Sequence, residues 1–262
     1  MANKFKLYNI VKRWIRSESV AHESNQSASN IHLQTVNLEP VFDVRSNKFS
    51  GVFCRSLLNY QEKDLRNQVN ECLMNIAYWH FHGRAIRCIL PIRAESILCQ
   101  ETMDEIECIL IASELPVGLV TIGISGTKGH SFQQLEPNLS RMKRLGIHLE
   151  MLNFSGTFED FRWLEYKDLS AVHFSLSLMR SAYKERDSLK ILLSALNQIK
   201  TSNFHTYCGG ISLVHDFIFA KKYGIHFCYG PLMMPTVSKH QILKIKDSQF
   251  ASILHKPTPS QH

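Results

Sequence analysis

The sequence predicts an α/β fold, a (β/α)8 barrel of the TIM type. From about residue 33 to residue 245, short apolar runs of strand length alternate with longer segments of helical periodicity. About eight such units fit into roughly 220 residues, which favours one closed barrel over an open sheet. With 262 residues, 44% of them hydrophobic, the chain can bury a full core and is excluded from the disordered class.

The elements follow in order along the chain. The first two apolar runs predict neighbouring strands, and the helix after them carries Leu65, Val69, Leu73 and Ile76 on one face. The predicted strands span 34–44, 50–58, 85–91, 119–124, 148–154, 171–176, 205–209 and 227–230. The predicted helices span 61–83, 102–114, 137–145, 158–166, 184–200 and 215–223. No apolar run approaches the roughly 18 residues of a membrane-spanning helix.

The regions outside the barrel differ in composition. Residues 1–17 predict a basic amphipathic helix with Trp14 on its apolar stripe. It would anchor to a membrane surface, bind a partner or dock on its own domain. Residues 18–32 are rich in Ser and Asn, a composition that is typical of linkers. Residues 33–250 form the predicted barrel, and residues 251–262 are predicted to be a flexible tail. Residues 1–17, here called the arm, hold five basic residues and no acidic residue, so the rest of the chain is nearly neutral. This near neutrality argues against nucleic-acid binding by the predicted barrel.

The seven cysteines predict free, buried thiols in a reducing cytoplasm. Their number is odd, none forms a CxxC pair, and they lie in apolar runs. This usage predicts neither a disulfide framework nor a metal site. No motif calls for a cofactor.

Several segments resemble the EAL domain family. Residues Glu39-Pro40-Val41-Phe42-Asp43-Val44-Arg45, followed by Gly51-Val52, are similar to the opening of that family. Similar landmarks follow at Leu115-Pro116, Leu145-Gly146-Ile147, Tyr223-Gly224 and Tyr229-Gly230-Pro231-Leu232. The resemblance covers about residues 33–245. It implies a barrel with one reversed strand. It also implies hydrolysis of the bacterial messenger cyclic di-GMP by two divalent cations, which acidic residues hold at the carboxyl ends of the strands.

The positions that carry this chemistry in the family are substituted here. The metal-binding Glu of the EAL tripeptide corresponds to Phe53, the phosphate-binding Arg to Leu57, and the catalytic Lys to His173. The complete set of substituted positions is Phe53, Leu57, Ile89, Gly123, Leu152, Asn153, His173, Gly209 and Tyr229. Apolar side chains and glycine offer no oxygen ligand to a hard cation. The resemblance is therefore to a degenerate member, for which we expect no phosphodiesterase activity and no bound metal.

The resulting expectation is a non-catalytic regulatory protein that binds another protein. It resembles stand-alone enterobacterial EAL-like regulators, which bind transcription factors and imply a role in motility, adhesion or virulence. Candidate contact residues are Phe53, Leu57 and Leu152 at the barrel mouth and Trp14 in the arm; alternatively, the apolar residues at the mouth only fill space left by the metals. A second hypothesis is an effector that binds cyclic di-GMP without cleaving it, although loss of the phosphate-binding Arg argues against tight binding.

Other partners stay open. Residues 4–16 could contact anionic lipid or nucleic acid through their basic side chains. A homodimer is also open, although 152–157 departs from the family's dimerisation region.

Overall fold

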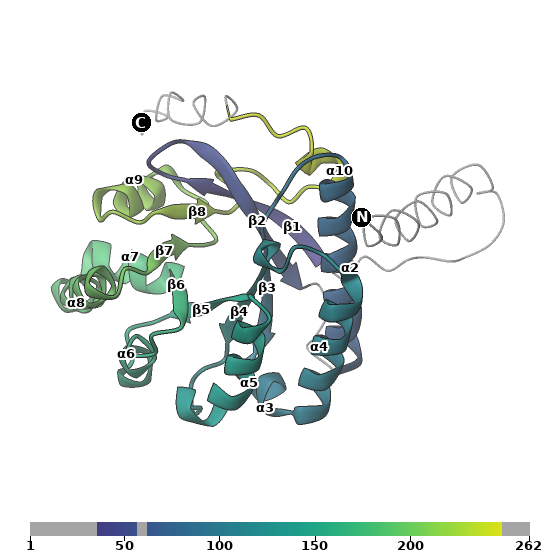
Figure 1. Cartoon of the computed structure of the whole chain (residues 1–262). Coiled ribbons are helices and arrows are strands. Elements are labelled where there is room, and N and C mark those ends of the chain that lie inside the picture. Colours follow the sequence, from purple (N-terminus) through teal and green to yellow (C-terminus); the bar gives the residue numbers. More distant parts are fainter. Residues whose placement is uncertain (1–35, 57–61, 248–262) are drawn as a thin grey trace.

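A computed structural model describes residues 36–56 and 62–247. Eight strands close into a barrel in the order β1 to β8 (Figure 1). Strand β1 runs antiparallel to both of its neighbours, β2 and β8, and the other neighbouring pairs are parallel. The predicted barrel with one reversed strand is thus confirmed. No helix in the described ranges is long and apolar enough to cross a membrane.

The strands and helices alternate around the ring. The strands are β1 Val36–Asp43, β2 Lys48–Ser56, β3 Cys88–Arg93, β4 Val120–Ser125, β5 His148–Phe154, β6 Leu169–Phe174, β7 His205–Cys208 and β8 Phe227–Tyr229. The helices are α2 Glu62–Phe81, α3 Ala94–Leu98, α4 Gln100–Ser113, the 3-10 turn η1 Val117–Leu119, α5 Phe132–Arg144, α6 Phe158–Trp163, α7 Leu176–Lys184, α8 Arg186–Ser202, α9 Val214–Lys222 and α10 Lys239–Ile242.

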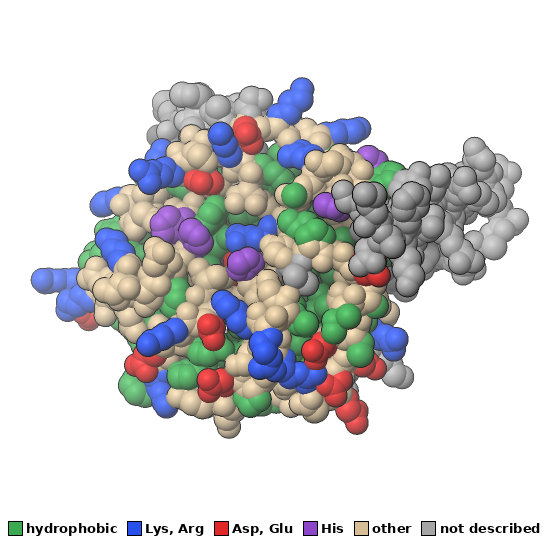
Figure 2. Space-filling view, in the orientation of Figure 1, with side chains coloured by type: hydrophobic (Ala, Val, Ile, Leu, Met, Phe, Trp, Pro, Cys, Tyr) green, Lys and Arg blue, Asp and Glu red, His purple; other side chains and the backbone are tan. Residues whose placement is uncertain are grey.

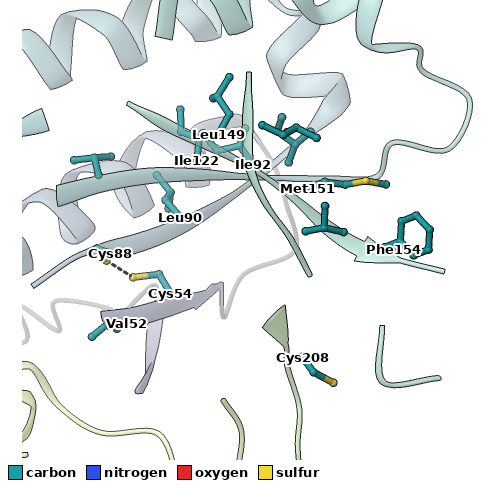
Figure 3. Packing of buried hydrophobic residues seen from close by; sticks show 14 of the residues in the cluster. Val52, Cys54, Cys88, Leu90, Ile92, Ile122, Leu149, Met151, Phe154 and Cys208 are labelled. Atoms are coloured by element: carbon teal, nitrogen blue, oxygen red, sulfur yellow. Dashed lines mark hydrogen bonds between the residues drawn. The ribbon is translucent and has the colours of Figure 1, made fainter. Parts of the chain in front are cut away.

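Side chains alternate between two apolar layers along each strand, as the pleat requires. In β4, Ile122 and Ile124 belong to the larger core between the strands and the surrounding helices. Figure 3 shows part of this outer layer, including Leu90, Ile92 and Met151. The alternate positions face the barrel interior. A separate cluster, here called the interior cluster, comprises Val41, Phe53, Ile89, Leu152, Ala171, Tyr207 and Tyr229.

Four helices differ from the sequence-based prediction. The short helices α3 and α10 were not predicted, and α5 and α7 depart from it as follows. Helix α5 begins at Phe132 and contains Pro137, where the prediction began the helix. The capping box of Ser131 and Gln134 starts the helix one turn earlier than the proline suggested. Helix α7 lies where a connection was expected. It is short but amphipathic, and the Ser175 side chain accepts a hydrogen bond from the Leu178 amide at 3.2 Å at its N-terminus.

Several predictions fall outside the described residues. These are the helix at 1–17 with Trp14, the linker at 18–32, Leu57 and the tail at 251–262. In Figure 2, basic and acidic side chains are interspersed over the displayed face of the described part.

We expect the stability of the β7–β8 pair to depend on pH through His226. Its Nδ1 accepts a hydrogen bond from the Thr206 amide at 3.0 Å, and burial, aided by the nearby His205, lowers the pKa of His226. The folded state therefore binds fewer protons than the unfolded state, whose His pKa is about 6.5. The stabilisation is complete above that pH and is lost as the pH falls through the lowered folded-state pKa.

Urea unfolding from neutral pH to about pH 5 measures this loss. The matched control is His226→Asn, whose amide oxygen can accept from Thr206 but does not titrate. The variant should show a shallower decline of the urea midpoint with falling pH. An identical decline in both proteins would contradict the assignment to His226.

Candidate functional site

The carboxyl ends of the parallel strands define the barrel mouth, where enzymes of this architecture place their catalytic groups. Five of the predicted positions converge inside the barrel here: Phe53 on β2, Ile89 on β3, Leu152 on β5, His173 on β6 and Tyr229 on β8. Each is at most 7% exposed. The structure thus brings together side chains that are far apart in the sequence.

The aromatic and aliphatic members of this group fill the interior. The rings of Phe53 and Tyr229 stack at 4.6 Å between centroids. A Cβ added at Gly209 would collide with the Tyr229 ring, and one added at Gly123 would lie 2.8 Å from Leu152. The space above both glycines is therefore occupied by a larger side chain from the neighbouring strand.

This packing bears on the expected docking surface at the mouth. Phe53 and Leu152 are buried and belong to the interior cluster, so neither offers an exposed apolar contact in this structure. Their placement matches the alternative expectation, in which these apolar side chains fill the space that the metals occupy in the family. A partner would have to bind the protein through other residues.

Asn153 does not join the group. It is exposed and has a positive φ of 60°, at an irregularity of the β5–β6 pairing between Met151 and Phe154. Asparagine tolerates this left-handed conformation better than most residues. The side chain is thus separated from the interior cluster by the backbone geometry of β5.

A buried polar network lies among the apolar interior side chains. His173 Nε2 lies 2.7 Å from Glu150 Oε2, and His173 Nδ1 lies 3.2 Å from the Tyr229 hydroxyl. The His173 ring stacks on Tyr207 at 4.2 Å, and Arg87 donates a hydrogen bond to the Tyr207 hydroxyl. Arg87 Nη1 also lies 3.7 Å from Glu150 Oε1. The network links strands β5 to β8 with the segment that leads into β3.

The protonation states follow from the surroundings. Burial and the Glu150 charge raise the pKa of Tyr207, and burial and the Glu39 charge raise that of Tyr229. Both phenols therefore keep their protons at neutral pH. If Tyr229 donates to Nδ1 and Nε2–H donates to Glu150, the imidazole of His173 satisfies both neighbours.

Buried carboxylates elsewhere in the described residues are also engaged. Arg55 makes a bidentate contact to Glu39, at 2.6 and 3.1 Å. Asp160 accepts hydrogen bonds from the amide and hydroxyl of Ser155, and Asp216 binds Arg180. A hard divalent cation needs several oxygen ligands. Within the ranges that the structure describes, no group of three His, Asp or Glu side chains gathers to supply them.

The sequence-based reasoning missed Arg87, Glu150 and Tyr207. One signal was available: Glu150 is a charged residue between the apolar residues Leu149 and Met151 of a predicted strand. It also missed that Cys54, Cys72 and Cys88 gather their sulfur atoms within 4.8 Å of one another, although no metal site was expected.

No protein-family model and no curated protein matches the sequence. Solved structures do match. The EAL domain of Mycobacterium smegmatis DcpA aligns with a TM-score of 0.69 at 12% identity, over 83% of this chain and 96% of the other. The Xanthomonas citri FimX EAL domain in complex with cyclic di-GMP aligns at 0.65 and 12% identity, over 88% and 95%.

The EAL enzyme Bd1971, in a form with bound cAMP and cyclic di-GMP, aligns with a TM-score of 0.66 at 12% identity. The match covers 80% of this chain, which spans 63% of the Bd1971 chain. At such low identity the likeness concerns the backbone arrangement. Together with the closed barrel and its reversed β1, these matches show that the chain has the EAL-domain fold.

Proposed function

We propose that this chain is a non-catalytic EAL-fold protein that regulates a partner by binding it. One observation carries the proposal: the positions that should hold metal ligands are occupied by packed side chains. Phe53, Leu152 and Tyr229 fill the mouth, and Gly123 and Gly209 lie beneath two of them.

The chemistry of phosphodiester cleavage supports this interpretation. Two-metal hydrolysis needs carboxylates that are free to bind cations and to position a water molecule. Glu39 and Glu150, the buried acids of the described interior, are paired with Arg55 and with His173 and Arg87. Recruiting either acid to a metal would break an ion pair whose carboxylate side is buried, which is costly.

The partner class comes from the resemblance stated above. A protein of this type would bind a transcriptional regulator or another signalling protein in the control of motility, adhesion or virulence. No described residue identifies the contact surface. Phe53 and Leu152 are excluded from it by their burial in this structure.

A second candidate is an effector that binds cyclic di-GMP without cleaving it. The observation in its favour is that the FimX and Bd1971 structures hold this molecule. At the mouth, Arg55 and Arg93 are the candidate phosphate ligands, but each already pairs with a carboxylate, Glu39 and Glu95 respectively. Binding the messenger would have to displace those pairs.

The regulatory proposal is tested by capture followed by reconstitution. We expect the full chain to co-purify with one protein at fixed stoichiometry from its native host. The two purified components should re-form the complex, and if the partner is a transcriptional regulator its affinity for DNA should change. A complex that forms only when cyclic di-GMP is added would instead support the effector candidate. Absence of a stoichiometric partner, together with messenger turnover, would contradict the proposal.

A further inference from the structure

Three cysteine sulfurs meet on the outer side of the barrel wall. Cys54 comes from β2, Cys88 from β3, and Cys72 from helix α2, which packs against this side of the strands. Their Sγ atoms lie within 4.8 Å of one another, and those of Cys54 and Cys88 are 3.1 Å apart (Figure 3). All three are at most 2% exposed. This cysteine trio is separate from the interior cluster.

The donor set of the trio is uniform. Within the described residues, no His, Asp or Glu joins the group of ligand atoms. Hard cations such as magnesium and calcium prefer oxygen, whereas thiol sulfur selects soft ions such as copper(I) or zinc. Structural zinc sites almost always have four ligands. A site with three sulfurs and no fourth donor therefore fits copper(I) better than zinc.

The spacing of the sulfur atoms is compatible with a bound ion. If each sulfur lies about 2.3 Å from a central ion, as in zinc–thiolate bonds, the sulfurs are about 4 Å apart. The Cys54–Cys88 separation of 3.1 Å would have to open by about 1 Å, which rotation about the two side chains can supply. We propose that Cys54, Cys72 and Cys88 form a binding site for one copper(I) ion, held between β2, β3 and α2.

The proposal predicts a stabilising cross-link between three elements. An ion that binds only the folded state raises its stability in proportion to the logarithm of the ion concentration over the dissociation constant. The reduced full chain, titrated with copper(I) without oxygen and in competition with a copper(I)-chelating dye, should take up one equivalent. Its melting temperature should rise with that equivalent.

Matched variants identify the ligands. Cys72→Ser should abolish the competitive uptake and the rise in melting temperature. Cys228→Ser, which changes a buried thiol outside the trio, should retain both. The double variant Cys99→Ser/Cys108→Ser removes the more accessible thiols and should also retain both.

A direct readout does not depend on whether the variants fold. The X-ray absorption spectrum of the copper-loaded wild-type protein should show a first shell of three sulfur atoms. A shell with nitrogen or oxygen, uptake that survives in a folded Cys72→Ser variant, or loss of uptake in Cys99→Ser/Cys108→Ser would overturn the proposal. Equally tight uptake of zinc would overturn the preference for an ion that accepts three sulfur ligands. No uptake in competition with the dye would leave the trio as core packing alone.

Discussion

Replacing His173 by leucine is expected to lower the free energy of unfolding by about 3 kcal/mol, the upper end of the range for leaving a buried polar group without its hydrogen bond. The substitution removes the hydrogen bond at 2.7 Å to Glu150, whose side chain is fully buried. Glu150 Oε1 has no hydrogen bond, and Arg87 at 3.7 Å would remain as its nearest cation. The carboxylate would then be buried with one distant partner. Chemical denaturation monitored by circular dichroism measures the change.

Two further variants define the cause of that loss. His173→Leu/Glu150→Leu should recover much of the lost stability, because replacing both partners of a buried hydrogen bond by apolar side chains can be nearly neutral. Arg93→Ala breaks an ion pair with Glu95 in which both side chains are about half exposed, and it should change stability by about 1 kcal/mol or less. A loss below about 1 kcal/mol in His173→Leu would contradict the idea that the hydrogen bond to the buried Glu150 side chain stabilises the fold.

Gly209→Ala is expected to destabilise the protein by about 1–3 kcal/mol through overpacking. The new methyl group would overlap the ring of Tyr229. That ring cannot move freely, because it stacks on Phe53 and its hydroxyl contacts His173. The effect should therefore lie toward the upper end of the range. Urea unfolding with a matched m-value provides the measurement.

The same site allows a test of mechanism. In a Tyr229→Leu background, Gly209→Ala should cost less than it does in the wild-type protein, because the smaller side chain leaves room for the methyl group. Gly118→Ala is the control, since an added Cβ there meets nothing within 4 Å. Additive effects of Gly209→Ala and Tyr229→Leu would contradict the idea that the tyrosine fills the space above the glycine.

Much of the fold was predictable from the sequence because the alternation of strands and helices is a property of local patterning. The exceptions have local causes as well. Pro137 was interpreted as a helix start, whereas the capping residues before it begin α5 earlier. Helix α7 is only nine residues long, and so short an amphipathic segment gives a weak periodic signal.

The site was predictable only in part. The resemblance predicted which positions lack the family's acidic side chains, and the structure places most of the described ones together. It could not show that Leu152 covers Gly123, because that contact joins two strands through the barrel interior. Single-sequence reasoning also treats a buried charge such as Glu150 as an exception to patterning. Its partners are Arg87, which lies just before β3, and His173 in β6. Their proximity to Glu150 could be established only from the three-dimensional structure.

The cysteine trio was missed for the same reason. Metal sites are recognised in sequences by short, regular spacings between ligands. Cys54, Cys72 and Cys88 are far apart along the chain and converge only because α2 packs over the β2–β3 pair. Their apolar neighbours correctly indicated burial of these three cysteines, but burial carries no information on mutual distance. The same expectation was wrong for Cys99, which is half-buried, and for Cys108, which is exposed on helix α4.

The central claim is that the barrel mouth of this protein has lost the cyclic di-GMP chemistry of the fold. It is tested most directly by calorimetric titration of the full chain with cyclic di-GMP, with and without Mg²⁺ or Ca²⁺, followed by chromatography of the mixture. For this chain we expect no heat of binding and no linear dinucleotide. An active EAL enzyme, used as the positive control under the same conditions, should give product. Binding without product would support the effector candidate and contradict the regulator acting independently of the messenger. Formation of the linear dinucleotide would contradict the proposal that the barrel mouth is non-catalytic.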